Sequence, residues 1–419
     1  MAEAYPSAPF PEPAVFAWGI LLNPAIWAGA LGYLVDIYDL NVGANFRQNL
    51  FRSLNVPPAQ TVETVVELTR WSSCGLLAGG FLWGILGDRV GRVFSLFGSI
   101  ALYSTAILVT ALFCHTLGFY RVAIFFVGLG LAGELGGSVT LVLESLPATM
   151  RTFGVMIVAA LGMVGVVLAG SLAEWVSWRT GFAVGGVMGL ALLVFRFHVR
   201  ESLLFRRLEL KHVLRGNWFA LLWPWASLRK YLACILLGVA PLFVLFFYSS
   251  FAPEIGRELH LAGDLKVNRA AVATFSGLAT GDLLVAWISY RLRSRKRPLL
   301  WFMAASAAIQ VAIISCRGGS AATVYGLLFL LGMATANALY VTTIAEQFGT
   351  NLRDTATTTV TNFIRFGVVP LGFILTSIQG SVGFSHAGFL ISLGILAVAI
   401  LALSRLKESY GADLEFLET

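Results

Sequence analysis

Two carboxylates inside an apolar stretch raise the first question about this sequence. Residues 32–43 read GYLVDIYDLNVG and place Asp36 and Asp39 three residues apart, with Tyr38 between them. The stretch from residue 24 to residue 34 is almost wholly apolar, and no basic residue follows before Arg47. Burial of a carboxyl group disfavours its ionised form, so a buried acid can take up and release a proton near neutral pH. These two acids are therefore candidates for proton transfer.

Three more ionisable residues stand in apolar runs further along the chain: Glu134, Asp282 and Arg365. Charges at membrane depth are costly, so each is a functional candidate. One base can neutralise only one or two acids, and the other acids must be unpaired or protonated. The planar guanidinium of Arg365 matches a carboxylate or a phosphate and could hold an anionic substrate. A permanent ion pair with Asp282 is the alternative, and both interpretations stay open.

The composition indicates a lipid environment. The chain has 419 residues, of which 58% are hydrophobic and 12% are charged, and its mean hydropathy is +0.80. A soluble domain has about a quarter of its residues charged, and one this apolar could not cover its own surface. The sequence therefore predicts an integral membrane protein with the lipid bilayer and not nucleic acid as its partner.

The cysteine and histidine pattern gives no indication of metal or disulfide chemistry. The four cysteines lie in or beside apolar runs without CxxC spacing, and the five histidines are scattered. We therefore expect no disulfide framework, no metal and no cofactor. The signatures HExxH and GxSxG do not occur, so an intramembrane enzyme is not expected either. The stretch MAEAYPSAPFPEP lacks the basic region of a cleaved signal peptide.

Apolar runs long enough to cross about 30 Å of hydrocarbon as helix recur along the chain. The expected fold class is therefore all-α. We predict twelve transmembrane helices, at residues 25–46, 66–86, 93–114, 119–144, 153–175, 180–197, 231–252, 269–290, 299–316, 321–344, 355–379 and 384–404.

The loops predict the orientation. Most of the 29 lysine and arginine residues fall in the loops after even-numbered segments and at the C-terminus. This excess marks the cytoplasmic side, so both termini are predicted to be cytoplasmic. The longest loop is basic and could contact anionic lipid, although an ordinary positive-inside bias is the simpler explanation. The predicted divisions are an N-terminal segment at 1–24, six-helix bundles at 25–197 and 231–404, a linker at 198–230 and a tail at 405–419.

The two halves resemble each other at a fixed offset of 202 residues. GLGLA at 128–132 aligns with LLGMA at 330–334, and ESLPATMR at 144–151 aligns with EQFGTNLR at 346–353. The Asp88-Arg89 loop aligns with Tyr290-Arg291. These matches indicate a duplicated six-helix unit. Paired repeats around a site at the membrane midplane are typical of secondary transporters.

GILGDRVGR at residues 84–92 resembles a loop signature of the major facilitator superfamily, G-x-L-x-D-R-x-G-R. GLGLAGELGG, SWRTGF, RESLLF and NFIRFGVVP resemble its sugar-porter and metabolite:proton symporter branches, and VDIYDL is similar to an Asp-x-x-Asp element of proton-coupled anion carriers. The resemblance covers nearly the whole chain and implies two pseudo-symmetric bundles. It departs at Arg121, which lies one turn before the family's arginine of segment 4, and at Tyr290, where the second-half loop has lost its acid.

The resemblance also implies a gate. In the family the loop acid, Asp88 here, faces the N-terminus of another helix, where negative charge is favoured. Such contacts can bias two rocking states. The alternative is that these residues only fix topology and loop shape. The residues assigned to gating are Gly84, Asp88, Arg89, Gly91, Arg92, Glu144, Arg151, Glu346 and Arg353.

Helix rise places the isolated charges about 12–17 Å from the cytoplasmic ends of their segments, near the midplane. The resemblance favours Asp36, Asp39 and Glu134 for proton coupling. A shallower, solvated Asp39 and a helix-packing hydrogen bond for Glu134 are the alternatives. Segments 7 and 10 line the cavity in this family. The residues assigned to substrate binding are Arg365, Asn362, Asp282, Tyr38, Tyr248, Asn337 and Tyr340.

Together these features predict a secondary active transporter in a plasma membrane, such as a bacterial inner membrane. It would be a monomer that takes up a small polar, anionic metabolite with protons by alternating access. A uniporter, an exporter or a sensor on a transporter fold are the alternatives, and the short ends speak against the sensor. The identity of the substrate is not readable from scattered single residues.

Overall fold

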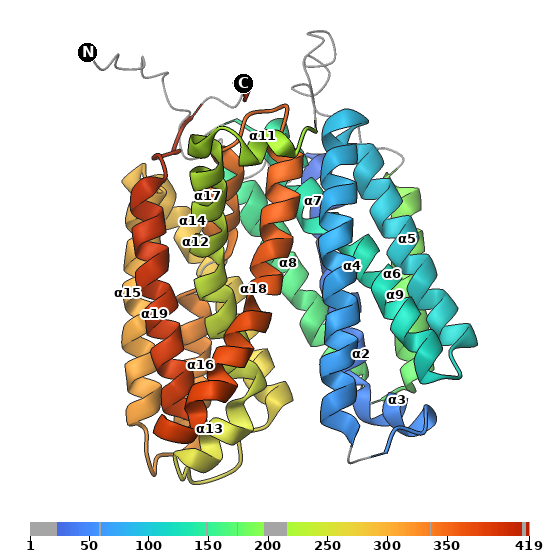
Figure 1. The fold of residues 1–419 in the computed structure, drawn as a ribbon, viewed down its shortest axis with the longest axis vertical. Helices are drawn as coiled ribbons and strands as arrows, with labels where there is room; N and C mark the ends of the chain where they lie inside the picture. Colours follow the sequence, from blue (N-terminus) through green and yellow to red (C-terminus); the bar gives the residue numbers. More distant parts are fainter. Residues whose placement is uncertain are drawn as a thin grey trace.

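The computed structural model describes residues 23–57, 60–147, 150–173, 175–196, 216–335, 337–412 and 416–418. These residues form a helical bundle in two halves (Figure 1). The predicted N-terminal segment and most of the predicted linker lie outside the described residues. The first half contains α2 (Pro24–Asn45), α3 (Arg47–Ser53), α4 (Thr61–Arg89), α5 (Arg92–Phe113), α6 (Leu117–Leu131), α7 (Glu134–Ser145), α8 (Arg151–Leu172) and α9 (Trp178–Arg196).

The second half begins with a short helix inside the predicted linker. The predicted seventh segment starts six residues early, at Trp225, directly after this helix. The second-half helices are α11 (Phe219–Leu222), α12 (Trp225–Ser250), α13 (Ala252–Glu258), α14 (Val267–Leu292), α15 (Lys296–Ser315), α16 (Ala321–Met333), α17 (Asn337–Glu346), α18 (Arg353–Val382) and α19 (Phe384–Arg405).

All twelve predicted segments are present as helix, and the fourth and tenth are each interrupted near their middle. The fourth is the pair α6 and α7, with Ala132 and Gly133 at the break. The tenth is the pair α16 and α17, with Ala334 at the C-cap of α16. The two alanines are 202 residues apart, which is the offset of the sequence repeat. The duplication therefore includes the interruptions, and each pair still forms one span long and apolar enough to cross a membrane.

Local sequence explains where several of these helices begin. Asn23 accepts a hydrogen bond from the amide of Ala25, and Pro24 takes the first helical position of α2, where its missing N–H costs nothing. Thr116 and Ser320 cap α6 and α16 in the same way. Nine segments of the described chain are long and apolar enough to span a membrane.

Glycines permit the closest helix contacts in each half. A methyl group on Gly75 or Gly79 of α4 would overlap backbone carbonyl oxygens of α6, and one on Gly277 or Gly281 of α14 would overlap carbonyls of α16. Both pairs are also related by the repeat offset. Close backbone approach of small residues is how membrane helices associate without a hydrophobic driving force between them.

The halves meet at one end of the bundle and diverge toward the other. In Figure 1 the upper part of α18 lies beside α4, and its lower part runs away from it. Gly80, Gly84 and Gly87 of α4 contact Asn362, Thr355 and Asp354 of α18. In the most apolar part of α18, by contrast, only 11% is buried inside the protein. We call the end with the α4–α5, α7–α8 and α17–α18 loops the closed end.

Candidate functional site

Among the described residues, an ion pair joins the two halves near their middle. Asp36 comes from α2 in the first half and Arg365 from α18 in the second, and 3.6 Å separates Asp36 Oδ2 from Arg365 Nη2. The Asp36 side chain is fully buried, whereas 16% of the Arg365 side chain is exposed. Neither Asp36 oxygen has a hydrogen-bond partner among the described residues. At 3.6 Å the pair is longer than a charge-assisted hydrogen bond and is an electrostatic contact.

Asp282 does not pair with Arg365, so the alternative of a permanent ion pair between them is wrong. Its Oδ1 accepts a hydrogen bond of 2.7 Å from the amide of Ala338, in the first turn of α17. The positive end of the helix dipole and an unsatisfied amide favour a carboxylate at that position. The break in the tenth segment thus supplies the partner of Asp282, and Arg365 pairs with Asp36 instead.

Glu134 and Asn362 both lie at the break in the fourth segment, each with its own hydrogen-bond partner. Glu134 is the first residue of α7, and its Oε1 accepts a hydrogen bond of 3.1 Å from the Ser138 hydroxyl. The Asn362 amide nitrogen donates to the carbonyl oxygens of Ala132, at 3.0 Å, and Thr358, at 2.8 Å. The bond to Ala132 crosses between the halves and satisfies a carbonyl that the interruption leaves open. Asn362 therefore bridges the halves one turn from Arg365.

Asp39 is buried inside the first half. Only 4% of it is exposed, so the alternative of a solvated position is wrong. It packs against Gly185 of α9, where a methyl group would overlap its carboxylate. Neither of its oxygens has a hydrogen-bond partner among the described residues. Buried polar groups normally have partners, so Asp39 stays a candidate for proton binding next to Asp36.

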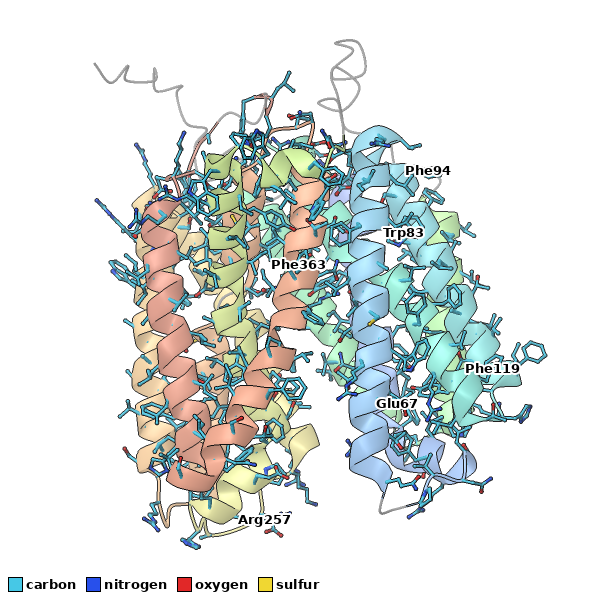
Figure 2. All side chains as sticks on the ribbon, in the orientation of Figure 1. Glu67, Trp83, Phe94, Phe119, Arg257 and Phe363 are labelled. Atoms are coloured by element: carbon cyan, nitrogen blue, oxygen red, sulfur yellow. The ribbon has the colours of Figure 1, made fainter. Side chains whose placement is uncertain are left out.

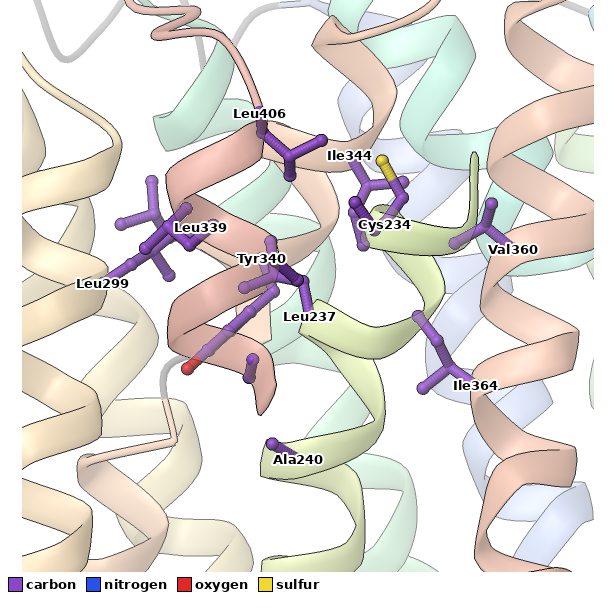
Figure 3. Close-up of a cluster of buried hydrophobic side chains, with 14 of the residues drawn as sticks. Cys234, Leu237, Ala240, Leu299, Leu339, Tyr340, Ile344, Val360, Ile364 and Leu406 are labelled. Atoms are coloured by element: carbon purple, nitrogen blue, oxygen red, sulfur yellow. The ribbon is translucent and has the colours of Figure 1, made fainter. Parts of the chain in front are cut away.

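The predicted aromatic residues lie mostly in the cores of the halves. Tyr38 donates a 2.8 Å hydrogen bond to the carbonyl of Gly181, within the first half. Tyr340 belongs to the apolar core of the second half, among side chains such as Leu237 and Leu299 (Figure 3). Tyr248 is fully buried in another apolar cluster. These positions favour packing, and we leave all three out of the proposed site. Asn337, half-buried at the start of α17 beside Ala338, stays in it.

At the closed end, Asp88 faces the N-terminus of α18. Its oxygens accept hydrogen bonds from the amides of Asp354, at 3.2 Å, and Thr355, at 2.8 Å. The Thr355 hydroxyl donates to the carbonyl of Gly84 at 3.0 Å. The placement that the resemblance implied for the loop acid is present. A carboxylate of one half here satisfies the amides that begin a helix of the other half.

A buried charge network surrounds this contact. Arg92 binds Glu144 through two nitrogens, at 3.1 and 3.2 Å, and approaches Asp88 at 3.1 Å. Arg353, from the second half, binds the same Glu144 at 2.9 Å. Arg92 also donates to the carbonyl of Thr350 at 2.8 Å. One carboxylate thus holds arginines from both halves, and separating the halves at this end would break buried, charge-assisted bonds.

The second half contains a copy of one of these pairs. Arg295 binds Glu346 at 2.9 and 3.1 Å, as Arg92 binds Glu144. The position of Glu346 was predicted from the repeat, but its partner Arg295 was not. The copy lies within one half, so Glu346 does not link the two bundles.

Two other predicted gating residues lie beside the network. Arg89 is exposed and lies near Gly216, within the predicted linker. Gly91 precedes α5 with φ of +142°, a conformation that favours glycine. This backbone conformation therefore explains why a glycine stands at this position of the signature.

Three residues at the interface between the halves were missed. Asp354 is fully buried at the start of α18, and neither of its oxygens has a hydrogen-bond partner among the described residues. Gly87 contacts it so closely that a methyl group there would overlap its carboxylate. Tyr33, one turn before Asp36, lies within electrostatic range of Arg365 and Asp282. An acid directly after a gating arginine was a signal for Asp354, whereas Tyr33 had none.

Comparison with known proteins relates this arrangement to transporters. A putative metabolite transport protein of Haemophilus influenzae is 30% identical over 196 residues. That match covers 45% of this chain and 45% of the relative, so the chain spans about half the length of that protein. The putative niacin/nicotinamide transporter NiaP of Bacillus subtilis is 24% identical over 88% of this chain and 91% of its own. The sialic acid transporter NanX of Escherichia coli is 24% identical over 92% of this chain and 95% of its own.

The fold has solved counterparts. The proton:xylose symporter XylE superposes with a TM-score of 0.74 over 94% of this chain and 98% of its own, at 15% identity. Residues 25–372 match the family description "Major Facilitator Superfamily", and they include all but the last helix and part of α18. These transporters carry small molecules and are not enzymes. The chain belongs to the Major Facilitator Superfamily.

Proposed function

We propose that this transporter imports a small anionic metabolite together with a proton. The observation that carries the proposal is the ion pair between Asp36 and Arg365, which links the two halves beside both broken helices. An arginine in such a pair has one exchangeable counter-ion. Its planar fork suits a carboxylate or phosphate of the substrate as well as it suits the aspartate.

Coupling follows from competition for Arg365. When Asp36 takes a proton from one side of the membrane, it no longer balances the guanidinium, and the anionic substrate replaces it. When the substrate leaves on the other side, Arg365 again favours the ionised carboxylate, and the proton follows the substrate. Glu134 lies within electrostatic range of Asp36 and, with the buried Asp39, supplies further acids along the proton path.

The positive charge of Arg365 supports an anion rather than a neutral sugar as substrate, and two amide side chains could supply further hydrogen bonds. Asn362 lies one turn before Arg365 on the same helix face, and Asn337 opens α17 beside Asp282. The name of one relative, a sialic acid transporter, refers to an acid. The exchange mechanism requires a negative charge on the substrate, and the size of that substrate stays open.

The closed end would be the inner gate. The excess of basic residues assigns it to the cytoplasm, so the halves diverge toward the outside, as an importer ready to receive substrate requires. Alternating access then needs the Asp88, Arg92, Glu144 and Arg353 contacts to break on the inside while the outer ends of the halves approach. We place the protein in the plasma membrane and propose a monomer, because each chain contains both halves.

Uptake into proteoliposomes under an imposed pH gradient tests this function. Carboxylic acids, phosphates, amino acids and sugars are screened with the lumen alkaline. We expect at least one anion to accumulate above its external concentration and to lose that accumulation when an ionophore collapses the gradient. Transport of a neutral sugar alone, or of an anion that equilibrates regardless of the gradient, would contradict the proposal.

A further inference from the structure

The chain does not leave the bundle after α19. Residues 406–412 and 416–418, which we call the tail strap, run across the closed end. Glu408 begins this path: its carboxylate accepts hydrogen bonds from the Ser294 hydroxyl, at 2.6 Å, and from the amide of Arg295, at 2.8 Å. Ser409 donates to Glu346 at 2.7 Å. The strap thus caps the start of α15 and joins the Arg295–Glu346 pair.

Further along, the strap binds the loop between α17 and α18. The carbonyl oxygen of Phe416 accepts a 3.0 Å hydrogen bond from the amide of Thr350. Glu418 and Asn351 form two hydrogen bonds, at 2.9 and 3.0 Å. The Glu418 carboxylate also pairs with Lys230 at the start of α12. Backbone and side-chain groups of the last described residues therefore fix this loop.

The strap also reaches the first half. Arg151, the first residue of α8, donates a 2.7 Å hydrogen bond to the carbonyl of Ala412. A second link is indirect: Thr350 donates its amide hydrogen to the carbonyl of Phe416, and its own carbonyl accepts a hydrogen bond from Arg92. The strap is covalently part of the second half. Each link to an arginine of the first half must break if the halves separate here.

We propose that the tail strap is a latch that stabilises the closed end and so sets the balance between the two states of the transporter. Its contacts add to the Asp88 and Glu144 network and involve residues that neither bind substrate nor carry protons. The latch would stabilise the closed end in the same way for any transported substrate or coupling ion. A chain without the strap should therefore open at this end more often, with its substrate preference unchanged.

Distances across the closed end test the latch. Spin labels are placed at two exposed positions, Val90→Cys in the first half and Arg297→Cys in the second, after the accessible Cys74 and Cys316 are replaced by serine. Pulsed electron resonance then compares the full chain with a chain that lacks residues 410–419. We expect the ratio of long to short distances to rise about fivefold or more, the effect of losing one or two hydrogen bonds.

A point variant and a matched control keep the test decisive if the shortened chain does not fold. Glu418→Ala removes the ion pair with Lys230 and leaves the rest of the chain in place, and it should raise the same ratio. Glu254→Gln changes an exposed acid of α13 and should give the distances of the full chain. The latch is wrong if the shortened chain gives the same distances as Glu254→Gln. If the shortened chain is unfolded, the same comparison is made with Glu418→Ala. Failure here would leave proton coupling unaffected, because that is measured by gradient-driven uptake.

Discussion

The carboxylate of Asp36 lies 3.6 Å from the guanidinium of Arg365 and forms an ion pair between the two halves of the transporter. Around it, both broken helices have a polar side chain from another helix at the break: Asn362 binds Ala132, and Asp282 binds Ala338. The arrangement leaves Arg365 as the charge best placed to exchange an internal acid for an external anion.

Replacing Asp36 by asparagine should separate proton coupling from substrate movement. Asp36→Asn mimics the protonated acid, so Arg365 stays available to the substrate. We expect counterflow exchange to continue, whereas accumulation driven by a pH gradient, about tenfold per pH unit for one proton, should fall to none. Asp39→Asn is the comparison, because Asp39 does not contact Arg365 and should keep part of the accumulation. Equal and full activity of both variants would remove segment 1 from the mechanism.

Substitution of Arg365 should weaken substrate binding more than folding. Arg365→Lys keeps the charge but loses the planar fork, and hydrogen bonds to charged groups contribute about 1.5–3 kcal/mol. We therefore predict a rise in KM of roughly tenfold to a hundredfold. Arg257→Gln, at an exposed arginine of α13, is the matched control and should leave KM unchanged. An Arg365→Lys variant with the original KM would exclude a bidentate contact with substrate.

The buried carboxylate of Glu144 should hold the closed end together. Glu144→Gln removes the partner of Arg92 and of Arg353, and breaking a buried pair typically costs about 3–5 kcal/mol. We expect the spin-label distances across the closed end to shift to the open state. Glu67→Gln is the control, because its pair with Arg121 is one-third exposed and lies within the first half. Unchanged distances in Glu144→Gln would limit the network to a role in topology.

Gly87 should be essential for closure at this end. A methyl group in Gly87→Ala overlaps the Asp354 carboxylate, and overpacking typically costs about 1–3 kcal/mol. We expect uptake to fall roughly tenfold, with the protein still folded and stable in detergent. Gly372→Ala adds the same methyl group in α18 where nothing lies within 4 Å, so it should transport normally. Equal uptake by the two variants would show that α4 and α18 need not approach this closely.

Acid should undock the start of the tail strap. Burial alone would raise the pKa of Glu408, but hydrogen bonds from Ser294 and from the amide of Arg295 lower it overall. A lowered pKa means that Glu408 stabilises docking above its usual range and loses that effect as pH falls through the lowered value. Hydrogen exchange at the amide of Arg295, compared with Glu408→Gln, checks this. At neutral pH the variant should exchange faster, and equal rates would exclude the cap.

The sequence predicted the fold well because its signals repeat at the scale of a helix. Twelve apolar runs predicted twelve segments, and an offset of 202 residues predicted two halves. The loop signature also placed Asp88 opposite a helix N-terminus. The breaks in the fourth and tenth segments were missed, because Ala132 and Ala334 lie in runs as apolar as any continuous helix.

The partners inside the membrane were harder to predict. Depth estimates from helix rise gave the level of each charge but not the direction in which it points. The sequence therefore left a pair between Arg365 and Asp282 of its own half open, and only the structure shows that Asp36 is the partner. Tyr38 and Tyr340 were also assigned to the site, although both lie in the cores of their halves. The interface between the halves can be followed in Figure 2, where Trp83 marks α4 of the first half and Phe363 marks α18 of the second.

Proton movement with substrate is the most direct test of the exchange at Arg365. Proteoliposomes hold a pH-sensitive dye in the lumen, and the anionic substrate found in the uptake screen is added outside without a pH gradient. We predict that its entry acidifies the lumen in the wild-type protein, with about one proton per substrate, and that Asp36→Asn carries the substrate without acidification. Entry without acidification in the wild type, or equal acidification in Asp36→Asn, would contradict the account.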